Sequence, residues 1–85
     1  LNLNNFKIYP NPSNSVFNIN FNSLINQDIS INIYSLLGKR IFSENLILYK
    51  GNFLKILDLS SYPKGVYSLE INTNDGIFIN KLILQ

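Results

Sequence analysis

Two stretches of this chain, residues 16–22 and 28–34, alternate apolar and polar side chains almost without exception. Successive side chains of a β-strand point to opposite faces, so a period of two places the apolar residues of each stretch on one face. The predicted buried residues are Phe17, Ile19, Phe21, Ile29, Ile31 and Ile33. We expect the two strands to pair as a hairpin, with Phe21 opposite Ile29.

Five further segments have strand signals and are bounded by Gly, Pro, Asn or Ser. They are residues 4–9, 40–46, 52–59 and the two arms of a terminal hairpin, 65–71 and 77–85. Short strands with turn signals about every 8–12 residues are typical of a β-sandwich. No helical period or capping box is present. The sequence therefore predicts an all-β antiparallel sandwich of about seven strands, as one domain over residues 1–85.

Two of these segments have a predicted orientation in the sheet. In residues 40–46 we expect Phe42 and Leu46 to point inward. Residues 52–59 offer two partly apolar faces, and we favour the one with Leu57 and Leu59 as the buried face. Gly38 lies in the turn before residues 40–46 and is suited to a positive φ.

The terminal hairpin has a turn signal at Asn74-Asp75-Gly76. A two-residue Asp75-Gly76 turn is a strong hairpin signal. It sets Tyr67 opposite Leu84 and Leu69 opposite Leu82 on the buried face, and Glu70 opposite Lys81 on the other. The same register places Ile77, Ile79 and Ile83 on the outward face with Glu70 and Lys81.

The composition argues against an enzyme, a metal site and a cofactor site. The chain has no His or Cys, and its five acidic residues are dispersed. Residues 72–76 offer only the Asp75 carboxylate to a calcium ion, which usually takes several. The net charge is +2, with scattered basic residues, so we expect no nucleic-acid partner. No apolar run approaches the ~18 residues of a membrane helix, so we expect no membrane insertion.

Four sequence blocks occur in order along nearly the whole chain. They are Tyr9-Pro10-Asn11-Pro12, then Ile33-Tyr34-Ser35-Leu36-Leu37-Gly38-Lys39, then Leu57-Asp58-Leu59-Ser60 with Lys64-Gly65-Val66-Tyr67, and finally Lys81-Leu82-Ile83-Leu84. In this arrangement the chain resembles the type A C-terminal sorting domains of the type IX secretion system of Bacteroidota. Ser35 stands where that family often has Asp or Asn.

The resemblance implies an Ig-like β-sandwich at the C-terminus of a larger cargo protein. Residues 1–8 then either open this domain or end the linker from the cargo. The family implies passage through the periplasm, with shuttle components, and then through the outer-membrane translocon to the cell surface or the medium. It also implies removal by a sortase-like C-terminal signal peptidase, at a point we expect upstream of Tyr9.

The resemblance also suggests where recognition by the translocon takes place. We expect the partner either to add to an exposed edge of the terminal strand or to dock on its outward face. The residues expected to take part are Lys81, Glu70, Ile77, Ile79, Ile83, Leu84 and Gln85. We expect a mainly structural role for the motif residues Tyr9, Pro10, Asn11, Pro12, Gly38, Lys39, Asp58, Leu59, Gly65 and Tyr67. The alternative for Lys81 is an ordinary cross-strand ion pair with Glu70.

Two other functions remain open from the residues. The tyrosines, of which Tyr34 and Tyr49 are the best surface candidates, would suit a carbohydrate-binding or adhesive β-sandwich that stays on the mature protein. A passive structural domain is the third reading. A sorting signal would be missing from mature cargo, whereas a binding module would persist and keep its glycan affinity.

Overall fold

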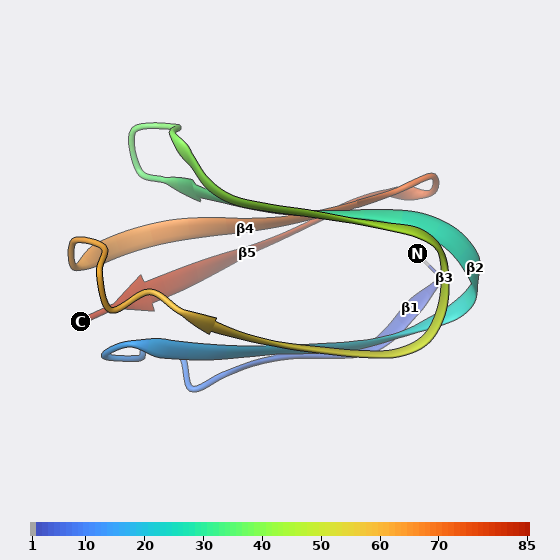
Figure 1. The fold of residues 1–85 in the computed structure, drawn as a ribbon, viewed down its shortest axis with the longest axis horizontal. Coiled ribbons are helices and arrows are strands. Elements are labelled where there is room, and N and C mark those ends of the chain that lie inside the picture. The colour runs from blue at the N-terminus through green and yellow to red at the C-terminus, as the bar shows by residue number, and fades with distance from the viewer. Residues whose placement is uncertain (1) are drawn as a thin grey trace.

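The computed structural model describes residues 2–85, which form one antiparallel sheet. Its five strands are β1 (Leu3–Tyr9), β2 (Val16–Ser35), β3 (Arg40–Asp58), β4 (Gly65–Thr73) and β5 (Gly76–Leu84). The order is β1-β2-β4-β5, and β3 pairs with β2 (Figure 1). The predicted all-β antiparallel class is confirmed. Leu1, the first residue of the predicted domain, lies outside the described residues. Residues 2–85 contain no helix that could cross a membrane.

The count of about seven strands is not confirmed, because two predicted connections lie inside continuous strands. β2 joins the predicted strands 16–22 and 28–34, and β3 joins 40–46 and 52–59. The predicted pairing of Phe21 with Ile29 is therefore wrong. Phe21 lies opposite Phe53 of β3, and Ile29 lies opposite Leu46. β2 and β3 thus form one long two-stranded ribbon.

The ribbon bends in the middle instead of breaking. Register shifts interrupt the β2–β3 pairing between Ser23 and Ile29, and such bulges bend strands without ending them. The Asp28 carboxylate accepts the Leu48 backbone N–H at 2.9 Å. Leu48 and Gly51 have φ values of 47° and 103°, a region that favours Gly. The bend is thus built from bulges, a side-chain hydrogen bond and positive φ angles.

The bend divides the sheet into two limbs that face each other (Figure 1). The first limb contains β1, residues 16–23 of β2 and residues 51–58 of β3. The second limb contains residues 27–35 of β2, residues 40–49 of β3, β4 and β5. β2 and β3 therefore belong to both limbs.

The core lies between the two limbs. Its buried apolar side chains come from β2, β3, β4, β5 and the segment after β3, and they are Phe17, Ile19, Phe21, Ile29, Ile31, Ile33, Phe53, Leu57, Leu59, Tyr67, Leu69, Ile71, Leu82 and Leu84. The period-two alternation thus predicted the buried face of β2 correctly. The inward orientation of Leu57 and Leu59 is also confirmed, and Phe42 and Leu46 pack partly buried against the core.

Different contacts close the two sides where the limbs meet. Between β1 and β5, the rings of Phe6 and Phe78 stack with centroids 4.2 Å apart. On the β3 side, Lys55 Nζ lies 3.3 Å from Glu44 Oε1 and 5.7 Å from the centre of the Phe42 ring. One side is therefore closed by an aromatic pair and the other by a partly exposed ion pair.

The terminal hairpin turns one position earlier than predicted. Thr73 lies opposite Gly76, so the turn residues are Asn74 and Asp75. The Thr73 hydroxyl oxygen accepts the Asp75 N–H at 3.2 Å, which is the hydrogen bond of a Ser/Thr turn.

This shift changes the opposing residues but not the faces. Lys81 lies opposite Ser68, and Glu70 lies opposite Ile79, so the predicted Glu70–Lys81 pairing is wrong. Moving a two-residue turn by one position changes the register by two residues, and a change of two keeps every side chain on its face. Tyr67 and Leu82, which oppose each other, are both buried as predicted.

The turn between β2 and β3 agrees with the sequence prediction. Gly38 has a φ of 88°, and its N–H bonds the Ser35 carbonyl at 2.9 Å. The Ser35 hydroxyl accepts the Lys39 N–H at 3.1 Å. The motif residues Gly38 and Lys39 are thus part of a tight turn at one end of the second limb.

Candidate functional site

The outward face of β4 and β5 exposes apolar side chains around a lysine. Ile77 and Ile79 are 59% and 63% exposed, and Val66 is 37% exposed. Ile83 is half-buried on the same face, and Lys81 is exposed between Ile79 and Ile83. We call this surface, formed by Val66, Ile77, Ile79, Lys81 and Ile83, the β4–β5 face.

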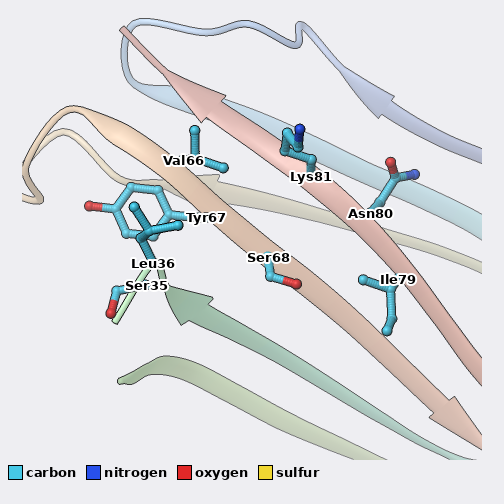
Figure 2. Close-up of a pocket in the computed structure, with 8 residues that line it drawn as sticks. All are labelled: Ser35, Leu36, Val66, Tyr67, Ser68, Ile79, Asn80 and Lys81. Carbon is cyan, nitrogen blue, oxygen red and sulfur yellow. The ribbon is translucent and has the colours of Figure 1, made fainter. Parts of the chain in front are cut away.

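A shallow cavity of about 300 Å³ lies on the β4–β5 face. Figure 2 shows its lining, which comes from the end of β2, the turn after it, and the two strands of the hairpin: Ser35, Leu36, Val66, Tyr67, Ser68, Ile79, Asn80 and Lys81. Lys81 is the one charged residue among them. The cavity therefore offers apolar walls and a single cation.

Two leucines beside this cavity were not predicted as surface residues. Leu36 and Leu37 are 80% and 96% exposed in the turn between β2 and β3, and Leu36 also lines the cavity. The available signal was the pair of leucines directly before Gly38, because consecutive residues of a tight turn cannot both reach the core. Exposed large apolar side chains that gather in one place mark interaction surfaces.

The Lys81 ammonium group has no ion-pair partner among residues 2–85. The Glu70 carboxylate instead accepts a hydrogen bond from the Asn72 side chain at 3.0 Å. This arrangement contradicts the reading of Lys81 as half of a cross-strand ion pair. Lys81 is thus a cation available to an external group.

The first motif of the chain meets the last strand. The Asn11 side chain donates from Nδ2 to the Lys81 carbonyl at 2.7 Å and accepts the Ile83 N–H on Oδ1 at 3.0 Å. The Ser13 N–H donates to the Ile83 carbonyl at 2.9 Å, and the Gln85 N–H donates to the Ser13 carbonyl at 2.8 Å. We call these four hydrogen bonds the clasp. It covers the outer edge of β5 from Lys81 onward.

Lys64 strengthens the same corner of the molecule. Its Nζ donates to the Asn14 carbonyl at 2.8 Å and to the Gln85 carbonyl at 3.1 Å. The loop after β1, the loop before β4 and the end of β5 are therefore held together. This meeting of the loops after β1 and before β4 with the end of β5 was not predicted.

The remaining residues of the predicted sets have varied environments. Leu84 is buried in the core and does not lie on the outward face, whereas Gln85, whose N–H belongs to the clasp, is exposed. Tyr9 is 47% exposed, and its carbonyl accepts a hydrogen bond from the Asn18 side chain at 3.0 Å. Pro10 and Pro12 are exposed on either side of Asn11.

The third motif block forms the connection between β3 and β4. The Asp58 carboxylate accepts the Ser60 N–H at 2.9 Å. Hydrogen bonds from the Ser60 hydroxyl and N–H lower the pKa of the Asp58 carboxyl below its ordinary value of 3.8. Leu59 is buried, Gly65 begins β4, and the Tyr67 hydroxyl donates to the Pro63 carbonyl. These contacts fit the structural role that we expected.

The described part of the chain holds no group of three acidic, His or Cys side chains placed to bind a metal ion. The β4–β5 face combines a cavity, exposed apolar side chains and a lysine, and the exposed Leu36 and Leu37 lie beside it. Such a surface is suited to contact another protein.

The chain matches the sequence model of one protein family. The sequence model described as "Secretion system C-terminal sorting domain" matches residues 7–85. The match includes the clasp, the β4–β5 face and all four motif blocks. No curated protein matches the chain significantly.

Proposed function

The chain belongs to the family of secretion system C-terminal sorting domains, and we propose that the translocon recognises it on the β4–β5 face. The domain is the C-terminal secretion signal of type IX secretion. It acts in association with a cargo precursor and the type IX machinery, and its destination is the cell surface or the medium. The family is one of sorting signals and not of enzymes.

The finer steps of the route are part of the proposal. The precursor passes the periplasm, engages shuttle components and the outer-membrane translocon, and loses this domain to a sortase-like signal peptidase upstream of Tyr9. The cargo is then released or anchored. We also propose that the two facing limbs correspond to the two sheets of an Ig-like sandwich. β2 and β3 each contribute one segment to each limb, so each limb is a sheet of paired segments on one side of the common core.

One observation supports the β4–β5 face above other surfaces. Exposed Ile77 and Ile79 adjoin a cavity whose single charge, Lys81, has no ion-pair partner within residues 2–85. An apolar patch with a free cation gives a partner both burial energy and charge specificity. The carbohydrate-binding alternative is not favoured, because the family match is to sorting signals.

The test uses the complete precursor in cells with an active type IX system. Ile79→Asp and Lys81→Glu alter the β4–β5 face. Ile56→Asp is a matched control, because Ile56 is 62% exposed on the outward side of β3 in the first limb. Lys7→Glu, at an exposed lysine of β1, controls for charge.

We expect the two face variants to lower secreted cargo by about tenfold, the factor given by ~1.4 kcal/mol of binding free energy. The controls should stay within about twofold, as usual for surface changes. Equal secretion of all four variants, with the domain folded, would contradict the proposal. Deleting residues 77–85 is not a clean test, because it removes the core residues Leu82 and Leu84.

A further inference from the structure

β5 is an edge strand whose outer edge is only partly covered. It is last in the sheet order and pairs with β4 alone. The clasp bonds the backbone of Lys81, Ile83 and Gln85 on that edge. Before Lys81, no backbone partner for this edge exists among residues 2–85. The uncovered part is residues 77–81.

The direction of the free backbone groups follows from the clasp. Backbone N–H and C=O groups alternate between the two edges of a strand. The groups bonded by the clasp belong to odd-numbered residues and point away from β4. The β4–β5 register runs without a shift from Gly65–Leu84 to Thr73–Gly76. The N–H and C=O of Ile77 and Ile79, and the N–H of Lys81, therefore point to the same open edge.

We propose that an extended segment of a protein partner adds to β5 along residues 77–81 as a further strand of the second limb. An acidic side chain of that segment faces Lys81, and its apolar side chains contact Ile77 and Ile79. This inference rests on the proposed function and specifies how the β4–β5 face is read. Backbone hydrogen bonds supply affinity in this mode, and side-chain contacts supply specificity.

The other edges of the sheet are less suited to pair with a partner. β1 has a register shift between Asn4 and Lys7, and Asn5 has a φ of 54°. β3 is bent at Leu48 and places Lys55 and Glu44 inward along its edge. Irregular backbone and inward charges are devices that protect edges from pairing. The open part of β5 has a regular register with β4 and carries the exposed Ile77 and Ile79. It has neither an irregular backbone nor an inward charge.

The clasp sets the end of the added strand. Beyond Lys81 the outer hydrogen-bonding groups are occupied by Asn11 and Ser13. The open segment of residues 77–81 spans roughly 15 Å at ~3.3 Å per residue. The partner segment is therefore short, with about five residues in register.

Proline at position 79 tests the backbone contribution. Ile79→Pro removes an N–H that points to the open edge and takes no part in pairing with β4, and Pro is tolerated on edge strands. Ile79→Val keeps the N–H and an apolar side chain and is the matched control. Ile77→Pro is a second variant of the same kind, for use if Ile79→Pro lowers the melting temperature.

The readout is cargo secreted from cells with an active type IX system, using the complete precursor. We expect the proline variant that keeps its melting temperature to lower secretion by about tenfold, equivalent to ~1.4 kcal/mol. Ile79→Val should lower it by clearly less, because it keeps the N–H and loses only part of the side-chain contact. Normal secretion of the folded proline variant overturns strand addition. If Lys81→Glu still reduces secretion in that case, the β4–β5 face remains the recognition site. If Lys81→Glu is also normal, the proposed recognition site fails too.

Discussion

The side-chain amide of Asn11 bonds to β5 as a neighbouring strand would, because it accepts the Ile83 N–H at 3.0 Å and donates to the carbonyl two residues earlier. Asn11 and Ile83 are 72 positions apart in the sequence. The first and last motif blocks of the family are thus one structural unit in this protein. This unit holds the end of β5 in place and leaves its beginning open.

Replacing Asn11 with Ala should free the end of β5. Two hydrogen bonds are lost, each with a net contribution of ~0.5–1.5 kcal/mol, and the exposed position favours the lower end of that range. We expect a loss of about 1 kcal/mol in urea unfolding and faster hydrogen exchange of the Ile83 amide. Asn11→Asp retains the acceptor, so it should preserve Ile83 protection better. Unchanged exchange in Asn11→Ala would show that the Asn11 side chain does not hold the Ile83 N–H in solution.

The Phe6–Phe78 stack should couple β1 to β5. Each Phe→Ala change should destabilise by less than the ~3–5 kcal/mol of a fully buried Phe, because both rings are only partly buried. A double-mutant cycle over the two positions should give a coupling of ~0.5–1.5 kcal/mol, as for aromatic pairs. Additive effects in the cycle would mean that the rings contribute only by separate burial.

Lys55 should protect the β3 edge more than it stabilises the fold. The Lys55–Glu44 pair is partly exposed, and such pairs contribute ~0–1 kcal/mol. Lys55→Ile should therefore change the unfolding free energy little and should increase self-association, because the outward Leu54 and Ile56 are already exposed. Sedimentation velocity across a concentration series measures this. A variant that remains monomeric at every concentration argues against edge protection.

Asp58 should make stability depend on acid pH. Its pKa is lowered in the folded state by the hydrogen bonds from Ser60. The folded state thus prefers the ionised carboxyl, so the contribution is complete above the unfolded-state value of 3.8 and is lost as the pH falls through the lower folded value. Asp58→Asn should flatten the stability curve below about pH 4. An identical acid limb in both proteins would remove Asp58 as its source.

The sequence predicted burial well because burial depends on a local pattern. The alternation over residues 16–22 and 28–34 placed Phe17 and Ile33 in the core, where both are fully buried. In the terminal hairpin the predicted turn was wrong by one position, but each side chain was still assigned to the correct face. The true turn at Asn74-Asp75 differs from the predicted register by two residues. A pattern with a period of two cannot distinguish registers that differ by an even number.

The continuity of β2 and β3 and the contacts around β5 depend on interactions between residues that are distant in the sequence, and no local pattern reveals these interactions. The bend needs Asp28 to bond Leu48 from the other strand of the ribbon, so the sequence alone favoured a break there. The clasp joins Asn11 to β5 across most of the chain, whereas the sequence indicated only a mainly structural role for Asn11. The exposure of Leu36 and Leu37, in contrast, follows from the tight turn at Gly38, which the sequence did predict.

The passage of β2 and β3 through both limbs has a consequence for quality control of the cargo. β2 and β3 supply pairing partners in both limbs, so melting of one limb disrupts strands that the other needs, and we expect a single cooperative transition. The clasp, the cavity and the open edge then vanish together when the domain is damaged. A precursor whose sorting domain is misfolded would then lack the whole proposed recognition site. We expect such a precursor not to be exported.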